Sequence, residues 1–144
     1  MPLRSEIPDP LAYNAATAEE FRANRGEVTG DFAGRPVLLL TTMGAKSGEP
    51  RTSPLIYTRD GECYVVTAAD GGSPKHPNWY HNLVANPTVT LEVASERFAA
   101  RAIEPNGAER DRLFEERCQA TPNFKNYQDK TTRRIPIIVF ERLA

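Results

Sequence analysis

The sequence VLLLTTMGAKSGEPRTSPLIYTRDGECYVVT, residues 37–67, decides the fold of this chain. It holds three apolar, partly β-branched runs at residues 37–42, 54–58 and 63–67, and Asp60-Gly61 supplies a tight hairpin turn before the third run. Each run is apolar at successive positions rather than only at alternate ones. Strands with two apolar faces are buried on both sides, so we expect these three to lie centrally in a closed sheet or barrel.

Three more strands are predicted further along the chain. Residues 88–93 alternate polar and apolar side chains, as a half-buried strand does, and residues 98–103 follow as its partner. The last strand is expected at residues 135–140, where Pro136 indicates a sheet edge or a strand start. About six strands, mostly neighbours in sequence, favour a small antiparallel barrel over a doubly wound sheet.

Helices are expected at the periphery of this barrel. Thr17-Ala18-Glu19-Glu20 has the pattern of a capping box that opens a short helix, and Gly26 is a natural stop. Further helices are predicted from Pro77 to about Asn86, from Asn106 to about Ala120, and after Thr121-Pro122. We therefore divide the chain into an N-terminal helical segment, residues 1–30, and a barrel domain, residues 31–144.

The composition is that of a globular protein without a strong charge. Charged residues make up 26%, hydrophobic residues 40%, and the net charge is -1, so no basic field points to nucleic acid. No apolar run reaches the roughly 18 residues of a membrane span, and the first residues lack the apolar core of a signal peptide, so we expect a cytoplasmic protein. The spacing of Cys63 and Cys118, and of His76 and His81, predicts reduced thiols and no metal site.

The first candidate site is the segment from Gly44 to Pro54. Its glycines let the backbone bend and expose N–H groups, Lys46 and Ser47 offer a charge and a hydroxyl, and Arg51 offers a planar fork suited to phosphate or carboxylate. The segment matches neither a Walker A loop nor a GxGxxG loop, and a solvated turn with two surface cations is the alternative interpretation. Its place between two strongly apolar strands favours a binding role.

The second candidate is the segment KHPNWYHNL, residues 75–83. Trp79 and Tyr80 on a short helix after a glycine-rich turn can wall a flat aromatic ligand. Asn78 and Asn82 share a helix face and can offer amide donors. The alternative is that Trp79 belongs to the core and Tyr80 to the surface.

The third candidate is the segment TPNFKNY, residues 121–127. Phe124 and Tyr127 share a helix face, so they can line a pocket in which Tyr127 donates a proton or a hydrogen bond to a substrate. A packed amphipathic helix is the alternative. Arg133 and Arg134 are predicted to be surface charges. Because no catalytic triad, carboxylate pair or activated cysteine stands out, we expect a cofactor to carry the difficult chemistry.

The motifs together resemble the deazaflavin-dependent nitroreductases, a family of split β-barrel proteins of actinobacteria. The resemblance runs in collinear order from about Arg35 to the C-terminus. It is carried by these motifs: LTTxGxKSGxPRxxPL (40–55), Gly71-Gly72, PxWYxNLxANP (77–87), Tyr127-Gln128 and Ile135-Pro136. It implies a mainly β (α+β) fold, a six-stranded antiparallel split β-barrel of the FMN-binding type with peripheral helices.

The resemblance also implies a cofactor, coenzyme F420, a deazaflavin that carries a phosphodiester and an oligoglutamate tail. Members of the family pass a hydride from the reduced form, F420H2, to small acceptors such as quinones, activated alkenes or nitroaromatics. The family pattern assigns three stretches to cofactor binding. They are Ala45, Lys46, Ser47, Arg51, Thr52, Ser53, Pro54, Leu55 and Ile56; then Thr67, Ala68, Ala69 and Asp70; and then Asn78, Trp79, Tyr80, His81 and Asn82.

The acceptor side departs from the family pattern. A nitroimidazole-activating member has a serine where this chain has Ala69, tyrosines at Thr121 and Phe124, and a lysine at Asp70. Of these hydroxyl groups, only Tyr127 remains as a catalytic candidate. The resemblance therefore implies that this chain binds the cofactor as the family does, but it does not imply nitroimidazole reduction.

Several alternatives stay open at this point. FMN could replace the deazaflavin, because one phosphate also suits the loop, and the chain could be a carrier or sensor that performs no catalysis. The sequence allows a monomer or a homodimer. It also allows peripheral membrane contact through the N-terminal helix.

Overall fold

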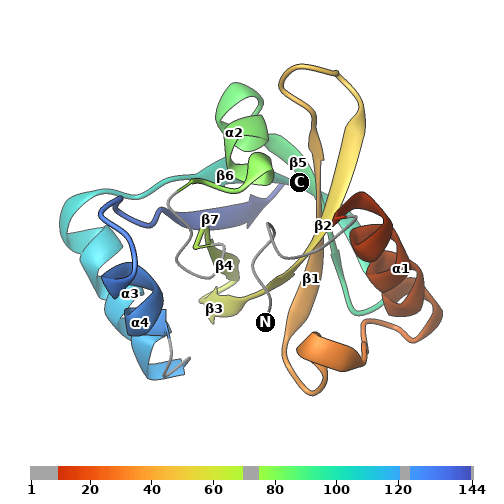
Figure 1. Cartoon of the computed structure of the whole chain (residues 1–144), viewed down its shortest axis with the longest axis horizontal. Helices are drawn as coiled ribbons and strands as arrows, with labels where there is room; N and C mark the ends of the chain where they lie inside the picture. The colour runs from red at the N-terminus through yellow and green to blue at the C-terminus, as the bar shows by residue number, and fades with distance from the viewer. Residues whose placement is uncertain (1–9, 70–74, 121–123, 144) are drawn as a thin grey trace.

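The computed structural model describes residues 10–69, 75–120 and 124–143 (Figure 1). Its helices are α1 (Pro10–Ala23), the 3-10 turn η2 (Gly30–Phe32), α2 (Asn78–Ala85), α3 (Gly107–Ala120) and α4 (Phe124–Asp129). Its strands are β1 (Val37–Met43), β2 (Pro50–Ile56), β3 (Thr58–Asp60), β4 (Cys63–Thr67), β5 (Thr88–Val93), β6 (Glu96–Ile103) and β7 (Ile137–Arg142).

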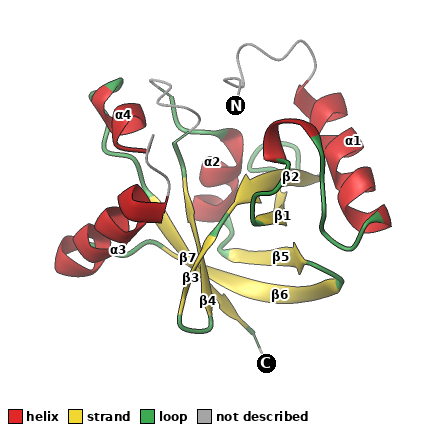
Figure 2. Cartoon of the chain, turned by 90° about the horizontal axis from the view of Figure 1, so that it is seen from below, coloured by secondary structure: helices red, strands yellow, loops and turns green. Residues whose placement is uncertain are grey.

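One antiparallel sheet of seven strands, in the order β2-β1-β5-β6-β7-β4-β3, curls into an open barrel (Figure 2). Its two edge strands, β2 and β3, are consecutive in the chain and meet at Tyr57. The backbone N–H of Tyr57 donates to the carbonyl of Pro36 at 3.0 Å, which fixes this corner. The split-barrel prediction is confirmed. The count of six strands is wrong by one, because the chain bends at Tyr57 and continues on the other edge.

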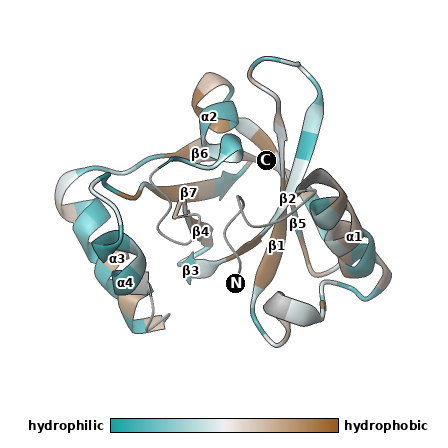
Figure 3. Ribbon diagram, viewed as in Figure 1, coloured by the Kyte–Doolittle hydropathy of each residue, from teal (hydrophilic) through white to brown (hydrophobic). Residues whose placement is uncertain are grey.

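The interior of the barrel takes one face of each long strand. Leu38 and Leu40 of β1 point inward and are fully buried with Leu91, Ile138 and Phe140. The opposite face of β1 presents Val37 and Leu39, which pack against side chains from α1 and η2. Figure 3 shows β1 as a hydrophobic band along its length. The two apolar faces predicted for this strand therefore have two different partners.

Two helical layers cover the outside of the barrel at opposite ends of the view in Figure 1. On one side α1 packs against β2 and buries Phe21, which is 1% exposed. On the other side α3 places Leu113 against Val65 of β4 and Ile137 of β7. The boundary at residue 30 stays a prediction, and α1 itself lies against the barrel.

The start of the first helix differs from the prediction. The helix begins at Pro10 rather than at Thr17, and the Thr17 hydroxyl donates to the carbonyl of Tyr13 at 3.1 Å, inside the helix. The Thr17 motif is therefore not a cap. The stop at Gly26 is confirmed, since its φ is +96° and its N–H donates to the carbonyl of Phe21 at 2.8 Å.

Two strand boundaries also differ. β2 begins at Pro50 and pairs Thr52 with Thr41, so the loop that was expected to run to Pro54 is shorter. The last strand, β7, runs from Ile137 to Arg142 rather than over residues 135–140, and it lies between β6 and β4. Pro136 therefore stands at a strand start, one of the two expected positions, and not at a sheet edge. The carbonyl of Pro136 accepts the N–H of Ala68 at 2.9 Å, and this hydrogen bond ties the residues after β4 to the start of β7.

Candidate functional site

A cleft of about 440 Å³ lies between the β1–β2 loop, strand β2 and helix α2. The loop, β2 and α2 come together at one end of the barrel, as Figure 1 shows. The lining residues are Asn14, Gly44, Ala45, Lys46, Ser47, Arg51, Thr52, Ser53, Asn78, Trp79, His81 and Asn82. The first two candidate segments of the sequence therefore form one site.

The loop that forms one wall is held closed by its own backbone. The N–H of Gly44 donates to the carbonyl of Glu49 at 2.8 Å, and the N–H of Gly48 donates to the carbonyl of Gly44 at 2.9 Å. Gly48 has φ +71°, a conformation that favours glycine. A side chain at Gly44 would collide with the Ser47 hydroxyl. The turn therefore favours glycine at position 48, whereas a side chain at position 44 would require the Ser47 hydroxyl to move. The turn presents Lys46 and Ser47 to the cleft.

Asn82 joins the helix to the loop. Its side chain is buried; the carbonyl oxygen accepts the N–H of Ala45 at 2.9 Å and the amide donates to the Thr42 hydroxyl at 3.1 Å. Both ends of the amide are therefore bonded to protein groups. Asn82 therefore positions the loop; it also lines the cleft, and its role as an amide donor to a ligand stays a prediction. Asn78, four residues earlier on the same helix face, is exposed at the cleft.

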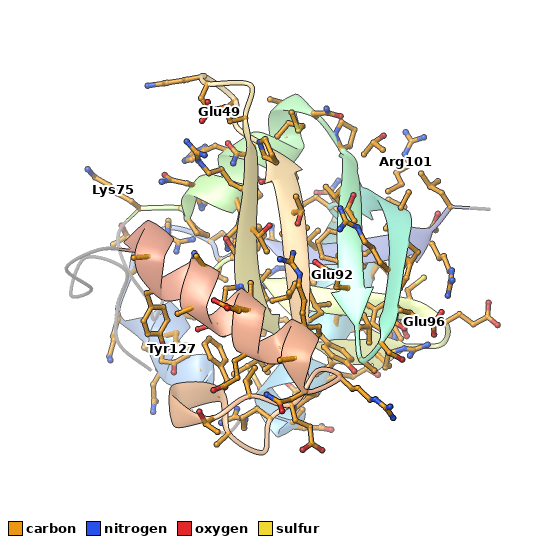
Figure 4. All side chains as sticks on the ribbon, turned by 90° about the vertical axis from the view of Figure 1, so that its right-hand side faces the viewer. Glu49, Lys75, Glu92, Glu96, Arg101 and Tyr127 are labelled. Atoms are coloured by element: carbon orange, nitrogen blue, oxygen red, sulfur yellow. The ribbon has the colours of Figure 1, made fainter. Side chains whose placement is uncertain are left out.

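The cleft carries two cations with little internal pairing. Lys46 is exposed and makes no ion pair with the described residues. Arg51 lies 3.4 Å from the Glu49 carboxylate, and both side chains are substantially exposed, at 38% and 68%. Exposed pairs of this kind stabilise a protein little. Figure 4 shows Glu49 at the tip of the loop, clear of the barrel, so both cations remain available to an anionic ligand.

Trp79 is both a core residue and a wall of the cleft. It is 7% exposed, packs in the barrel interior, and lines the cleft on one side. Tyr80 points elsewhere: its hydroxyl donates to the Glu104 carboxylate at 2.6 Å and its ring lies 4.6 Å from that of His76. Burial, followed by this hydrogen bond, raises the pKa of Tyr80 to about 12. Tyr80 is therefore a neutral neighbour of the cleft and not a lining residue.

Arg133 organises the residues that follow β4. Its guanidinium donates to the carbonyls of Ala68 at 2.9 Å and Ala69 at 2.7 Å, and lies 2.9 Å from Nδ1 of His76. Burial and the Arg133 charge both lower the pKa of His76. The prediction that Arg133 is a surface charge is wrong, whereas Arg134 is exposed. Nothing in the sequence indicates that Arg133 is partly buried and bonded to the backbone while the adjacent Arg134 is exposed.

The remaining predicted residues lie outside the cleft lining. They are Pro54, Leu55, Ile56, Thr67, Ala68, Ala69 and Tyr80. Tyr127 packs with Cys118 against Ala69 and Ile135. Figure 4 places it far from the loop tip with Glu49. Asp70, Thr121 and the side chain of Phe124 lie outside the described residues.

Asn14 is a lining residue that the sequence analysis missed. It comes from α1, and nothing in the composition of that helix indicates a ligand contact. Among the described residues, no group of three or more His, Cys, Asp or Glu side chains is placed to hold a metal ion. The helices in the described part of the chain include none long and apolar enough to cross a bilayer.

This arrangement matches a known protein family along most of the chain. The model of the F420H(2)-dependent quinone reductases matches residues 14–142, which include the loop, the Trp79 helix and Arg133. The chain belongs to this family. An F420H(2)-dependent quinone reductase of Mycobacterium tuberculosis is 40% identical over 126 residues, which cover 85% of each chain. The deazaflavin-dependent family predicted from the sequence is thereby confirmed.

Solved structures of family relatives share the fold. A structure of an F420-H2 dependent reductase (FDR-A) is 41% identical, has a TM-score of 0.68, and covers 74% of this chain and 95% of that chain. Another, described as a domain-swapped dimer, is 36% identical, has a TM-score of 0.70, and covers 92% of this chain and all of that chain. The split barrel is therefore the architecture of the family.

Proposed function

We propose that the protein reduces a quinone with a hydride from reduced coenzyme F420, and that the cleft between the β1–β2 loop and α2 binds this cofactor. The observation that carries the proposal is the pairing of two available cations with a buried tryptophan wall in one cleft, in a chain of this family. Other small acceptors, activated alkenes and nitroaromatics, are weaker candidates because the family is one of quinone reductases.

The charges and donors of the cleft fit the anionic part of coenzyme F420. Lys46 supplies a mobile point charge, and Arg51 a fork that can bind a phosphodiester oxygen pair. The Ser47 oxygen accepts the N–H of Glu49 at 3.2 Å, so the hydroxyl hydrogen remains available for a ligand oxygen. A phosphodiester with an acidic tail would replace the weak contact between Arg51 and Glu49.

Bound F420H2 would supply the hydride, and the protein would supply binding and orientation. Trp79 offers an apolar surface to a flat ring. Arg133 fixes the carbonyls of Ala68 and Ala69, in the stretch that the family resemblance assigns to the ring. Tyr127 packs against Ala69, and its role as a catalytic hydrogen-bond donor to the acceptor stays a prediction.

We infer a homodimer as the candidate assembly, because one relative is described as a domain-swapped dimer. Cytoplasmic location remains a prediction. Membrane contact through α1 has little support, because Ala18 and Phe21 of that helix are buried against the barrel and cannot face a lipid surface.

The test uses the purified protein, reduced coenzyme F420 and a quinone such as menadione. Return of the oxidised cofactor's visible absorption, at a rate that depends on protein concentration, is the expected result. Cofactor binding without turnover across a broad acceptor panel would instead indicate a carrier or sensor. Tight retention of FMN with no binding of F420 would overturn the proposal.

A further inference from the structure

Arg117 of α3 is a buried cation that the cleft described above does not use. The residue is 5% exposed, and one of its terminal nitrogens, Nη2, donates to the carbonyl of Ile56 at 3.2 Å. Its Nε and Nη1 have no hydrogen-bond partner among the residues that the structure describes. The protein therefore buries a guanidinium with donors left unused.

Such an arrangement destabilises the folded protein when no ligand is bound. A buried donor without a partner loses its hydration and gains nothing in return, and a buried charge without a counter-charge loses more. No carboxylate neutralises Arg117 among the described residues; burial, and then the charge of Arg35, lower its pKa to about 10. The group still carries its charge at neutral pH. A ligand oxygen that accepts from the free N–H groups would offset this cost.

The position of Arg117 indicates which ligand that would be. Its bond to Ile56 lies at the end of β2, the strand whose Arg51, Thr52 and Ser53 line the cleft. From Arg51 to Ile56 an extended strand spans about 17 Å. With the cofactor phosphate at Arg51, the other end of the cofactor would lie toward Ile56.

The other neighbours of α3 agree with this placement. Phe114 and Cys118, on either side of Arg117 in the helix, pack against Ala69 and Ile135 together with Tyr127. Ala69 belongs to the stretch that the family resemblance assigns to the deazaflavin ring. Arg117 and Tyr127 thus come from adjacent helices to the side of the barrel where the acceptor would meet that ring.

We propose that Arg117 binds the oxygen of the quinone acceptor through its free N–H groups and stabilises the negative charge that this oxygen gains. The inference rests on the proposed function. In the reaction the quinone accepts a hydride from F420H2 and becomes the hydroquinone monoanion, and one further proton completes the quinol. F420H2 loses that hydride and one proton and becomes F420, so electrons and protons balance. Arg117 remains protonated throughout and acts by charge and hydrogen bonding.

A buried cation can stabilise a developing oxyanion without hydroxyl donors. A cation that is buried and already in place needs no reorganisation as charge develops on the acceptor. The specificity that follows is for acceptors whose reduction creates an oxyanion.

The experiment compares Arg117→Met and Arg117→Lys with Arg35→Met, which removes a nearby but exposed cation. Two probes are titrated into protein without cofactor and followed by visible absorption. They are menadione, which is neutral, and 2-hydroxy-1,4-naphthoquinone, whose anion resembles the reduced acceptor. We expect Arg117→Met to lose about tenfold in affinity for the anion, much less for menadione, and nothing for F420. Arg35→Met should behave like the unmodified protein.

Steady-state kinetics supply the second readout. With F420H2 and menadione, Arg117→Met should lose about 100-fold in kcat while the KM for F420H2 stays the same, and Arg117→Lys should recover part of the rate. Replacing an unpaired buried charge by an apolar side chain often leaves stability unchanged or raised, so the Met variant should fold, which circular dichroism checks. If Arg117→Met does not fold, the rate of Arg117→Lys tests the inference instead, because this variant keeps the positive charge and loses the planar guanidinium.

Two results separate this inference from the proposed function. If the unmodified protein reduces menadione and Arg117→Met keeps both its rate and its preference for the anionic probe, the inference on Arg117 is wrong and the proposed function stands. If the unmodified protein neither binds F420 nor reduces menadione, but holds the anionic probe through Arg117, the proposed function is wrong and an anion site at Arg117 is supported.

Discussion

At the scale of single residues, Asn82 shows how a side chain that lines the cleft can position the protein groups around it. It satisfies the N–H of Ala45 and the hydroxyl of Thr42 at once. Truncation to alanine leaves the N–H of Ala45 and the buried hydroxyl of Thr42 without these partners. We expect Asn82→Ala to destabilise the fold by about 1–3 kcal/mol. It should also weaken F420 binding, because the loop that carries Lys46 loses its anchor.

Urea unfolding and an F420 titration measure the two effects. The matched control is Asn78→Ala, on the same helix face but exposed, which should leave stability within about 0.5 kcal/mol of the original. If Asn82→Ala and Asn78→Ala were equally stable, this result would contradict the positioning role of Asn82.

For the two cations of the cleft, we expect substitution to weaken F420 binding without lowering the stability of the fold. Lys46 and Arg51 hold no strong internal partner, so the double variant Lys46→Gln/Arg51→Gln should change the free energy of unfolding by no more than about 0.5 kcal/mol. Its affinity for F420 should fall by a factor of about 100, because each charge-assisted contact to an anion contributes about 1–2 kcal/mol. The binding isotherm of the original protein should weaken with added salt more steeply than that of the variant.

Arg101→Gln serves as the control for that experiment. Arg101 is an exposed cation of β6 outside the cleft lining (Figure 4). Its removal lowers the net charge as one cleft substitution does and should leave F420 affinity almost unchanged. If the double variant and this control bind F420 alike, the loop does not hold the anionic tail.

At the scale of elements, an ion pair adds to the apolar packing that holds α1 against the barrel. Arg22 donates to both oxygens of Glu92 on β5, each at 2.9 Å, and Figure 4 shows Glu92 beside that helix. The Arg22 hydrogen bonds lower the pKa of the Glu92 carboxyl, against the opposing effect of burial. Since the folded-state pKa lies below the unfolded value, the pair stabilises the fold above the unfolded pKa and loses this effect as the pH falls through the folded one.

We therefore expect Glu92→Gln to cost about 1–2 kcal/mol at pH 7, a value reduced for the half-exposed Arg22 side chain. The cost should begin to shrink as the pH falls below the ordinary pKa of a glutamate carboxyl, about 4.3. It should vanish only once the pH has passed the lowered pKa of Glu92 in the folded protein. Urea unfolding across this pH range measures it. Glu96→Gln breaks a fully exposed pair with Arg142 and should have little effect at any pH. If Glu92→Gln lowered the free energy of unfolding by the same amount at every pH, the ion pair would not be the origin of the effect.

The elements also show what the sequence could predict. The alternating pattern at residues 88–93 predicts β5 to its observed ends, because Val89 and Leu91 of one face are buried and Thr88 and Thr90 of the other are not; Glu92 is buried as well, in its ion pair with Arg22. The start of β2 was missed because Pro50 and Pro54 interrupt the pattern, yet an edge strand tolerates prolines on its unpaired side. The start of α1 was missed because Thr17 imitates a cap, while Pro10 suits a first helical turn.

The site was predictable only where a motif marks it. The loop from Gly44 to Ser47 and the helix with Trp79 could be predicted to bind a ligand, and the structure brings them into one cleft. Arg133 and Arg117 could not be predicted, because their roles follow from long-range contacts, to Ala69 and to Ile56, that leave no local pattern. Burial of an arginine depends on how α3 and β7 pack, and a charge in a polar run gives no indication of it.

At the scale of the whole molecule, the cleft should couple cofactor binding to global stability. Its walls come from the β1–β2 hairpin, α2 and, through Asn14, α1; α2 packs on the barrel interior and α1 on the opposite face of β1. A ligand that binds only the folded state stabilises it by about 2.7 kcal/mol at a hundred times its Kd. For a chain of 144 residues this predicts a rise in Tm of roughly 5–11 °C with F420.

The same experiment distinguishes the cofactor and the role of the loop. The Lys46→Gln/Arg51→Gln variant should melt at the temperature of the original protein without ligand, and should show a much smaller rise at the same F420 concentration. Differential scanning fluorimetry with F420, FMN and free phosphate provides the comparison. A larger rise with FMN than with F420 would assign the cleft to a flavin. An equal rise in the original protein and the double variant would place the cofactor away from the loop, because the added stability would then not depend on its charges.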